Sequence, residues 1–214
     1  MPMRNRERFQ KFGEWVRENC CKGREMKTPV TGGRDYDVKW AEPQCFVGNL
    51  YPLMSARADA ASVTPSILVM CGGGDGAGET SEYLDSRQHI NRPDEVGETL
   101  EFQLVHAIYE PGTRTGKMTG ERETPHESME WNDLCDEGSM VLVDWMDDTK
   151  AALLGADSIP GTDLIIRRKS VRWEPLKENG AVADRRPFYM GVVAVTCETQ
   201  TREDNNRTIQ ALLD

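Results

Sequence analysis

The segment Phe188–Cys197, FYMGVVAVTC, constrains the fold more than any other part of the chain. Its residues are apolar on both alternating faces, which is typical of a strand that is covered on both sides. A second run, Ser66–Cys71, has the same character and ends in glycine. We therefore expect a sheet in which Phe188–Cys197 is a central strand and Ser66–Cys71 is a buried one.

Further strands are expected at Leu100–Tyr109 and Leu164–Trp173. In the first of these, alternate positions separate into two faces, and Pro111-Gly112 then ends the strand. The alternation of Tyr36, Val38 and Trp40 indicates a short additional strand.

Two segments have helical spacing of apolar residues. Residues 5–20 place Phe9, Phe12, Val16 and Cys20 on one side, which predicts an amphipathic helix. That helix either covers one face of the sheet or docks on a neighbouring subunit. Residues 130–154 predict one kinked helix, or a short helix followed by a longer one, because Gly138 interrupts the apolar stripe.

This order of elements predicts an α+β fold, with a mostly antiparallel or mixed sheet and helices packed on one face. We expect a single domain over residues 1–198, with extended loops at about 23–65, 72–98 and 111–127. Residues 199–214 are polar except for a short apolar tip, which indicates a flexible C-terminal arm.

The chain of 214 residues has a formal net charge of -10. Because duplex affinity comes mainly from Lys and Arg side chains at phosphates, this charge argues against a DNA-binding surface. No segment approaches the run of about 20 apolar residues that spans a membrane. The first residues also lack the apolar stretch of a signal peptide. We therefore expect a protein of the cytoplasm without a membrane partner.

The residues give little indication of catalysis. The 6 cysteines show no paired spacing for a metal, and in a reducing cytosol we interpret them as free thiols. His106 lies on the apolar face of its strand, which favours a satisfied core or interface histidine over a general base. We expect no catalytic residue, no metal and no cofactor.

The glycine-rich run LVMCGGGDGAG at 68–78 provides the alternative from a different class. A strand that leads into glycines can cradle a phosphate when a helix begins directly after them. Here the following residues lack an apolar helical stripe, and no Lys-Ser or Lys-Thr completes a P-loop. A flexible loop is the simpler interpretation, and a small nucleotide-binding enzyme that uses residues 72–78 stays open as the alternative.

The second half of the chain carries an ordered set of motifs. HAIYEPGTR at 106–114 precedes MVLVDWMDDTKAALL at 140–154, and SVRWEPL at 170–176 and RRPFYMGVVAVT at 185–196 follow. In order and spacing, these motifs resemble the tail terminator proteins of tailed bacteriophages and phage-tail-like particles. The resemblance covers roughly residues 98–198, and the N-terminal helix fits the same layout. The stretch at 23–98 is longer than in a minimal family member, and the arm at 200–214 is extra.

The resemblance implies a subunit of a ring, usually a hexamer, that caps the tail tube and stops its polymerisation. The partners would be copies of itself, the tail tube protein and a head–tail connector or neck protein, with the tail sheath as a further candidate. Genomic DNA would pass through the lumen without specific binding. The location would be the tail or neck of a virion assembled in the host cytoplasm. A neck or stopper subunit, or a tail tube protein, is the nearest alternative.

A ring requires a heterologous interface, in which one patch meets a different patch on the next copy. Aromatic and Met side chains are favoured anchors of such interfaces. We therefore predict subunit or partner contacts at Phe12, Trp15, Trp40, Tyr109, Arg114, Trp131, Met190, Leu212 and Leu213. For Trp173 and Phe188 we expect ordinary core packing.

Overall fold

The computed structural model describes residues 3–30, 38–48, 63–75, 98–110, 131–178, 181–182 and 187–199. For residues 75, 131–138, 178 and 181–182 only the backbone is described. The expected loop at 111–127 and the arm beyond Thr199 lie outside these ranges.

The chain begins with helix α1 (Asn5–Val16), which continues directly into a π-helical turn, η1 (Arg17–Cys21). Five strands follow: β1 (Met26–Pro29), β2 (Val38–Ala41), β3 (Gln44–Val47), β4 (Ser66–Asp75) and β5 (Thr99–Tyr109). After helix α4 (Trp131–Gly155) come β6 (Leu164–Ile166), a 3₁₀ turn η3 (Arg168–Ser170) and β7 (Arg172–Pro175). The chain then forms β8 (Lys177–Glu178), β9 (Ala181–Val182) and β10 (Phe188–Thr199).

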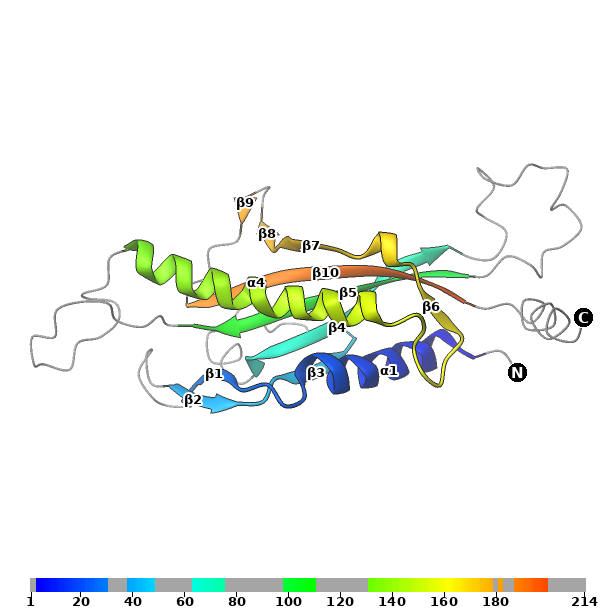
Figure 1. The fold of residues 1–214 in the computed structure, drawn as a ribbon, viewed down its shortest axis with the longest axis horizontal. Helices are drawn as coiled ribbons and strands as arrows, with labels where there is room; N and C mark the ends of the chain where they lie inside the picture. Colours follow the sequence, from blue (N-terminus) through cyan, green and yellow to red (C-terminus); the bar gives the residue numbers. More distant parts are fainter. Residues whose placement is uncertain are drawn as a thin grey trace, which may run out of the picture.

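The main sheet has the strand order β3-β4-β5-β10-β6, and β7 also pairs with β10. Strand β10 is central, as the sequence predicts: it pairs antiparallel with β5 on one side and with β6 and β7 on the other. Among the strands that the structure describes, β3 and β4 alone run parallel, so the sheet is mixed. A separate hairpin is formed by β1 and β2. Figure 1 shows the sheet with α4 and α1 lying along it.

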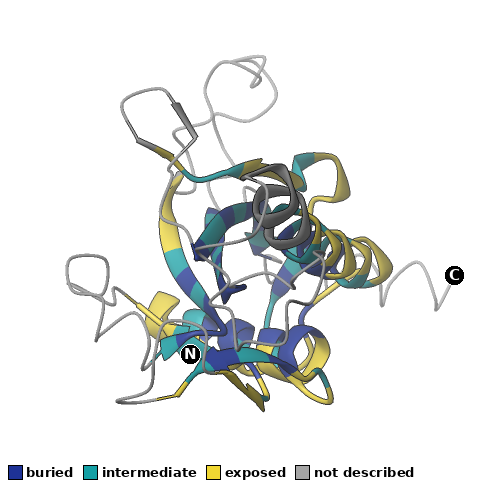
Figure 2. Cartoon of the chain, turned by 90° about the vertical axis from the view of Figure 1, so that its left-hand side faces the viewer, coloured by how far each residue is buried: buried dark blue, intermediate teal, exposed yellow. Residues whose placement is uncertain are grey.

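Both helices cover the same face of the sheet. Phe12 of α1 stacks on Phe102 of β5, with ring centroids 4.1 Å apart. Trp145 of α4 meets His106 of β5 edge-on, at a centroid distance of 4.9 Å. Residues 102 and 106 lie on one face of the strand because side chains alternate with a period of two. Figure 2 shows the sheet curling around this buried side, and the α+β prediction with helices on one face is confirmed.

Alternation in β5 is as expected, since Leu100, Phe102, Leu104, His106 and Ile108 are all buried. The second predicted helix forms one continuous helix, α4, rather than two. It packs closely on β10 at Gly191, which is buried beneath Met146.

Three expected boundaries need correction. The stretch 23–65 contains more strand than expected: the short strand predicted around Val38 and Trp40 forms as β2, whereas β1 and the parallel strand β3 are additional. The loop expected from residue 72 begins later, because β4 continues to Asp75. The strand expected at Leu164–Trp173 is interrupted by η3. There the hydroxyl of Ser170 accepts a hydrogen bond from the Thr196 amide (2.8 Å), so a side chain replaces a backbone partner in the ladder.

Candidate functional site: exposed surfaces for assembly

The predicted contact residues are distributed between the core, the surface and the part of the chain beyond the described ranges. Phe12 has no exposed surface, and Tyr109 is only 3% exposed, packed against Phe188 at a centroid distance of 5.1 Å. Neither side chain is available to a neighbour in this conformation, so we correct both to core residues. Trp15 and Met190 are half-buried. Arg114, Leu212 and Leu213 lie outside the described residues, as does the side chain of Trp131.

Trp40 is the predicted contact residue that the structure places most openly, with 61% of its surface exposed. It lies on β2 opposite Lys27, and Val38 on the same side lies opposite Pro29. Val30 and Val38 are also exposed. We call Val30, Val38 and Trp40 the hairpin surface.

Two contacts of β1 hold the hairpin surface against the rest of the molecule. The Lys27 ammonium pairs with the Glu110 carboxylate at 2.5 Å, and both side chains are largely buried. On the inward side of β1, the Thr28 hydroxyl donates a hydrogen bond of 2.6 Å to the Thr64 carbonyl. These contacts join the hairpin to the end of β5 and to the start of β4, so its exposed tryptophan has a defined position.

A second exposed surface lies where α4 meets β7. Trp173 is 41% exposed, which overturns the expectation of core packing for this residue. The Lys150 ammonium of α4 lies over its ring, 5.9 Å from the centroid. Leu154, one helical turn beyond Lys150, is 42% exposed. We call Lys150, Leu154 and Trp173, together with η3, the α4–β7 surface.

The part of this surface at η3 carries three consecutive exposed cations, Arg167, Arg168 and Lys169. Arg167 pairs with Glu198, and Arg168 pairs with Asp157 at 2.5 Å. They line an open depression together with Asp157, Ile165, Ile166 and Ser170. The sequence signal for this surface is three cations close to a tryptophan, in RRKSVRW at 167–173, and it has no apolar periodicity that would mark it as functional.

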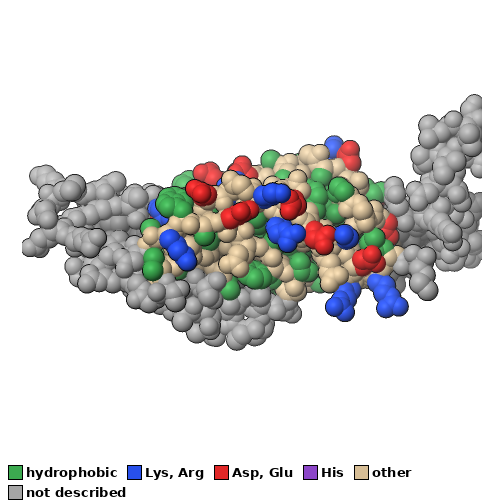
Figure 3. All heavy atoms as spheres, turned by 90° about the horizontal axis from the view of Figure 1, so that it is seen from below, with side chains coloured by type: hydrophobic (Ala, Val, Ile, Leu, Met, Phe, Trp, Pro, Cys, Tyr) green, Lys and Arg blue, Asp and Glu red, His purple; other side chains and the backbone are tan. Residues whose placement is uncertain are grey.

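The two surfaces lie on different sides of the molecule. β7 borders β10 at one edge of the sheet, whereas the β1–β2 hairpin lies beyond the other edge, near β3 and α1, as Figure 1 shows. The underside of the molecule, where α1 lies, carries interspersed cations, carboxylates and apolar groups (Figure 3). An apolar anchor at each side is the arrangement that a head-to-tail contact between copies requires.

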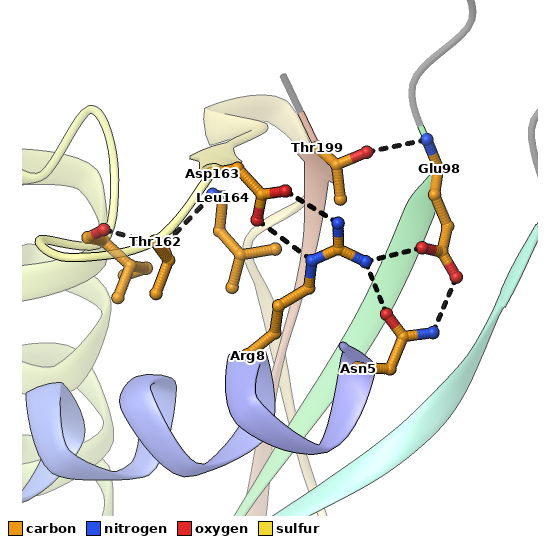
Figure 4. A network of polar contacts seen from close by, with 8 residues as sticks. Asn5, Arg8, Glu98, Thr162, Asp163, Leu164 and Thr199 are labelled. Atoms are coloured by element: carbon orange, nitrogen blue, oxygen red, sulfur yellow. Dashed lines mark hydrogen bonds and ion pairs between the residues drawn. The ribbon is translucent and has the colours of Figure 1, made fainter. Parts of the chain in front are cut away.

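A buried ionic network fixes α1 to the rest of the body (Figure 4). The guanidinium of Arg8 binds Asp163 through hydrogen bonds of 2.9 and 2.7 Å, and Glu98 through one of 2.7 Å. Asn5 bridges the same group, accepting from Arg8 at 2.5 Å and donating to Glu98 at 2.7 Å. The hydrogen bond to Asp163 raises the pKa of Arg8, although burial opposes this.

His106 is a core residue, as the sequence favours. Its Nε2 lies 2.9 Å from the Thr149 hydroxyl and its Nδ1 lies 3.1 Å from the Leu104 carbonyl. Burial lowers its pKa to about 4, so the imidazole stays neutral at physiological pH. With both nitrogens engaged inside the core, it is not placed to act on a substrate.

The described part of the glycine run is used for strand pairing. Gly73 and Gly74 pair with Glu101 and Leu100 of β5 across a bulge after Cys71. A side chain at Gly74 would meet the Thr99 carbonyl at 2.6 Å, and one at Gly72 would meet Glu101 at 2.8 Å. Close approach to β5 explains Gly72 and Gly74, and a φ of 128° explains Gly73, in each case without a phosphate. Residues 76–78 lie outside the described part.

Within the described ranges, no group of three or more His, Cys, Asp or Glu side chains could hold a metal ion. A search of the same ranges for a helix of the length and hydropathy of a membrane span finds none. No family profile, curated protein or solved structure matches this chain.

Proposed function

We propose that this chain is a structural subunit of a phage tail or phage-tail-like particle, a tail terminator that forms a ring on the tail tube. The observation that carries the proposal is the pair of exposed tryptophans, Trp40 and Trp173, on different sides of one sheet-and-helix body. Exposed tryptophans are costly to leave in water and are enriched among the anchors of protein interfaces.

The motifs that resemble the terminator family support the same proposal, because their elements belong to one compact unit. β5 and β7 both pair with β10, and α4 packs on β10 and β5. A body of this kind can repeat around an axis without rearranging its core.

The ring contact follows from the two surfaces. The hairpin surface of one copy contacts the α4–β7 surface of the next, and each copy uses both surfaces. The contact therefore closes into a ring when a whole number of copies completes one full turn. The apolar anchors contribute most of the affinity, and the cations of η3 set the register.

The remaining faces of the ring meet the tail tube protein on one side and the head–tail connector or neck protein on the other. Contact with a tail sheath would involve the periphery. Acidic side chains toward the lumen would repel DNA phosphates and keep the channel free for the genome, in line with the net charge of -10. The subunit acts in the virion tail or neck and is assembled in the host cytoplasm. On this proposal it is not an enzyme.

Electron microscopy of the purified chain, alone and mixed with tail tube subunits, tests the proposal. A terminator gives single rings alone and short, capped tubes in the mixture. Long tubes formed by the chain alone would instead identify a tail tube protein. Monomers under all conditions, with tube growth unaffected, would refute a ring-forming role.

A further inference from the structure

The π-helical turn η1 brings two adjacent cysteines into the interior. Cys20 is 6% exposed and Cys21 is fully buried. π-Helical turns are frequent at functional sites.

The two thiols face different elements. The Cys20 carbonyl accepts a hydrogen bond of 2.9 Å from the Trp145 indole, and its thiol is hydrogen-bonded to Thr149, also on α4. The Cys21 Sγ instead lies 4.0 Å from the Gln44 carbonyl on β3, immediately before Cys45.

Cys45 is the natural partner of Cys21. Its Sγ lies 3.4 Å from the Gly13 carbonyl, and Cys45 directly follows Gln44, whose carbonyl lies 4.0 Å from the Cys21 Sγ. Hydrogen bonding between the two thiols lowers the pKa of Cys45 and raises the pKa of Cys21. Cys45 is also only half-buried, whereas Cys21 has no exposed surface. A small oxidant therefore meets Cys45 first, and this is the sulfur that ionises more readily.

We propose that Cys45 and Cys21 form a thiol pair that hydrogen peroxide or another small hydroperoxide oxidises to an intrachain disulfide. The Cys45 thiolate attacks one oxygen of hydrogen peroxide, the O–O bond breaks, and the departing hydroxide takes a proton to leave as water. Cys45 is then a sulfenic acid. The Cys21 sulfur attacks the Cys45 sulfur, the S–O bond breaks, and the hydroxyl leaves as water with the Cys21 proton. In total, two thiols lose two electrons to the peroxide, and two water molecules form.

Cys20 does not compete for Cys45. Its thiol is directed to Thr149, and burial raises its pKa to about 12, so it supplies little thiolate. Cys71 is exposed on β4 and Cys197 is buried in β10, so both serve as internal controls within the same chain.

The disulfide would tie the end of the N-terminal helix to β3, which pairs only with β4 within the described sheet. It would close the loop from residue 21 to residue 45 and raise the unfolding temperature. If the proposed function holds, the bond would form after the particle leaves the reducing cytoplasm.

The test oxidises the full chain with a small excess of hydrogen peroxide, alkylates the remaining thiols and maps the peptides by mass spectrometry. We expect a linked pair of peptides containing Cys21 and Cys45, lighter by two hydrogens and separated by dithiothreitol. The unfolding temperature should rise on oxidation and fall again on reduction.

Three variants identify the roles of the sulfurs. Cys21→Ser should leave a sulfenic acid on Cys45 that dimedone traps, Cys45→Ser should abolish the linked peptide, and Cys71→Ser should change neither result. A linked pair that involves other cysteines, or wild-type protein that keeps both thiols alkylated after peroxide, would overturn the proposal. The peptide map of the wild-type chain decides the matter even when a variant does not fold. Because the oligomeric state does not enter the measurement, the result is separate from that of the ring experiment.

Discussion

Arg8 and Asp163, 155 positions apart in the chain, are joined by two parallel hydrogen bonds of 2.9 and 2.7 Å. The guanidinium is 7% exposed and also binds Glu98, so one cation in the first turns of α1 connects the helix to two distant segments. Such bidentate pairs hold orientation as well as position.

We predict that Arg8→Met lowers the free energy of unfolding by roughly 2–3 kcal/mol, because two partly buried carboxylates lose their cation. The effect stays below that of a fully buried pair, since Asp163 and Glu98 keep 26% and 29% of their side-chain surface exposed. Urea titration followed by circular dichroism measures it. Lys11→Met, which removes the exposed pair with Glu14, is the matched control and should cost at most about 1 kcal/mol. Equal effects of the two substitutions would argue against a structural role for the network.

His106 gives a dependence of stability on pH. Its pKa falls from 6.5 in the unfolded chain to about 4 in the folded chain because the imidazole is buried. Below pH 6.5 the unfolded chain binds a proton that the folded chain does not, so stability decreases as pH falls from 6.5 to 4 and is fully present above 6.5. The loss amounts to about 3 kcal/mol at most.

The check is to measure the free energy of unfolding at several pH values for wild type and for His106→Gln. The glutamine can still bond Thr149 but does not titrate, so the variant should show a shallower slope between pH 6.5 and 4. Indistinguishable slopes would mean that the pKa of His106 is the same in the folded and the unfolded chain.

The fold was predictable wherever local patterns decide it. The two-sided apolar run Phe188–Cys197 and the alternation of Leu100–Tyr109 each reflect the burial of one strand, and both strands form as expected. The helical stripe of α1 was equally visible, because Phe12 and Val16 are buried. Arg8 lies on that same stripe, one turn before Phe12, but a charged residue gives no signal of burial when its partners are 90 and 155 positions away.

What the sequence left open depends on long-range pairing. Strand β3 has only four residues, and it is defined by its parallel pairing with β4, which is distant in the sequence. Trp173 is expected in the core because of its size, yet it lies on an edge strand with the Lys150 ammonium over its ring and 41% of its surface exposed. The interface residues were predicted by type alone, so the buried Phe12 and Tyr109 could not be distinguished from the exposed Trp40.

The close contact of α4 with β10 predicts a cost for any side chain at Gly191. A Cβ there would overlap the Met146 sulfur, so Gly191→Ala should destabilise the chain by about 1–3 kcal/mol through overpacking. The cost should shrink in the background of Met146→Ala, because the overlapping atoms are then absent. Gly155→Ala at the end of the same helix is the control, since no atom lies within 4 Å of the added carbon. Thermal or urea unfolding of wild type, Gly191→Ala, Met146→Ala, their double variant and Gly155→Ala compares the effects.

The two exposed tryptophans give the sharpest prediction about assembly. Trp40→Ala should leave the free energy of unfolding almost unchanged, because 61% of Trp40 is exposed, whereas Trp173→Ala should also lower it, because more than half of Trp173 is covered and Lys150 lies over its ring. Each should nevertheless weaken ring formation by about 2 kcal/mol or more, which raises the concentration needed for assembly about 30-fold. Sedimentation velocity over a range of concentrations measures this shift, with Lys11→Ala as the control on α1.

A mixing experiment then tests whether the two surfaces meet each other. In a head-to-tail contact, a copy that lacks Trp40 still offers an intact α4–β7 surface, and a copy that lacks Trp173 still offers an intact hairpin surface. A mixture of the two variants can therefore form isolated dimers through one intact contact but cannot propagate it around a ring. Dimers that appear only in the mixture support the pairing of Trp40 with the α4–β7 surface. Dimers in both unmixed samples would show instead that each surface binds the same surface of a second copy, since each variant retains one intact surface.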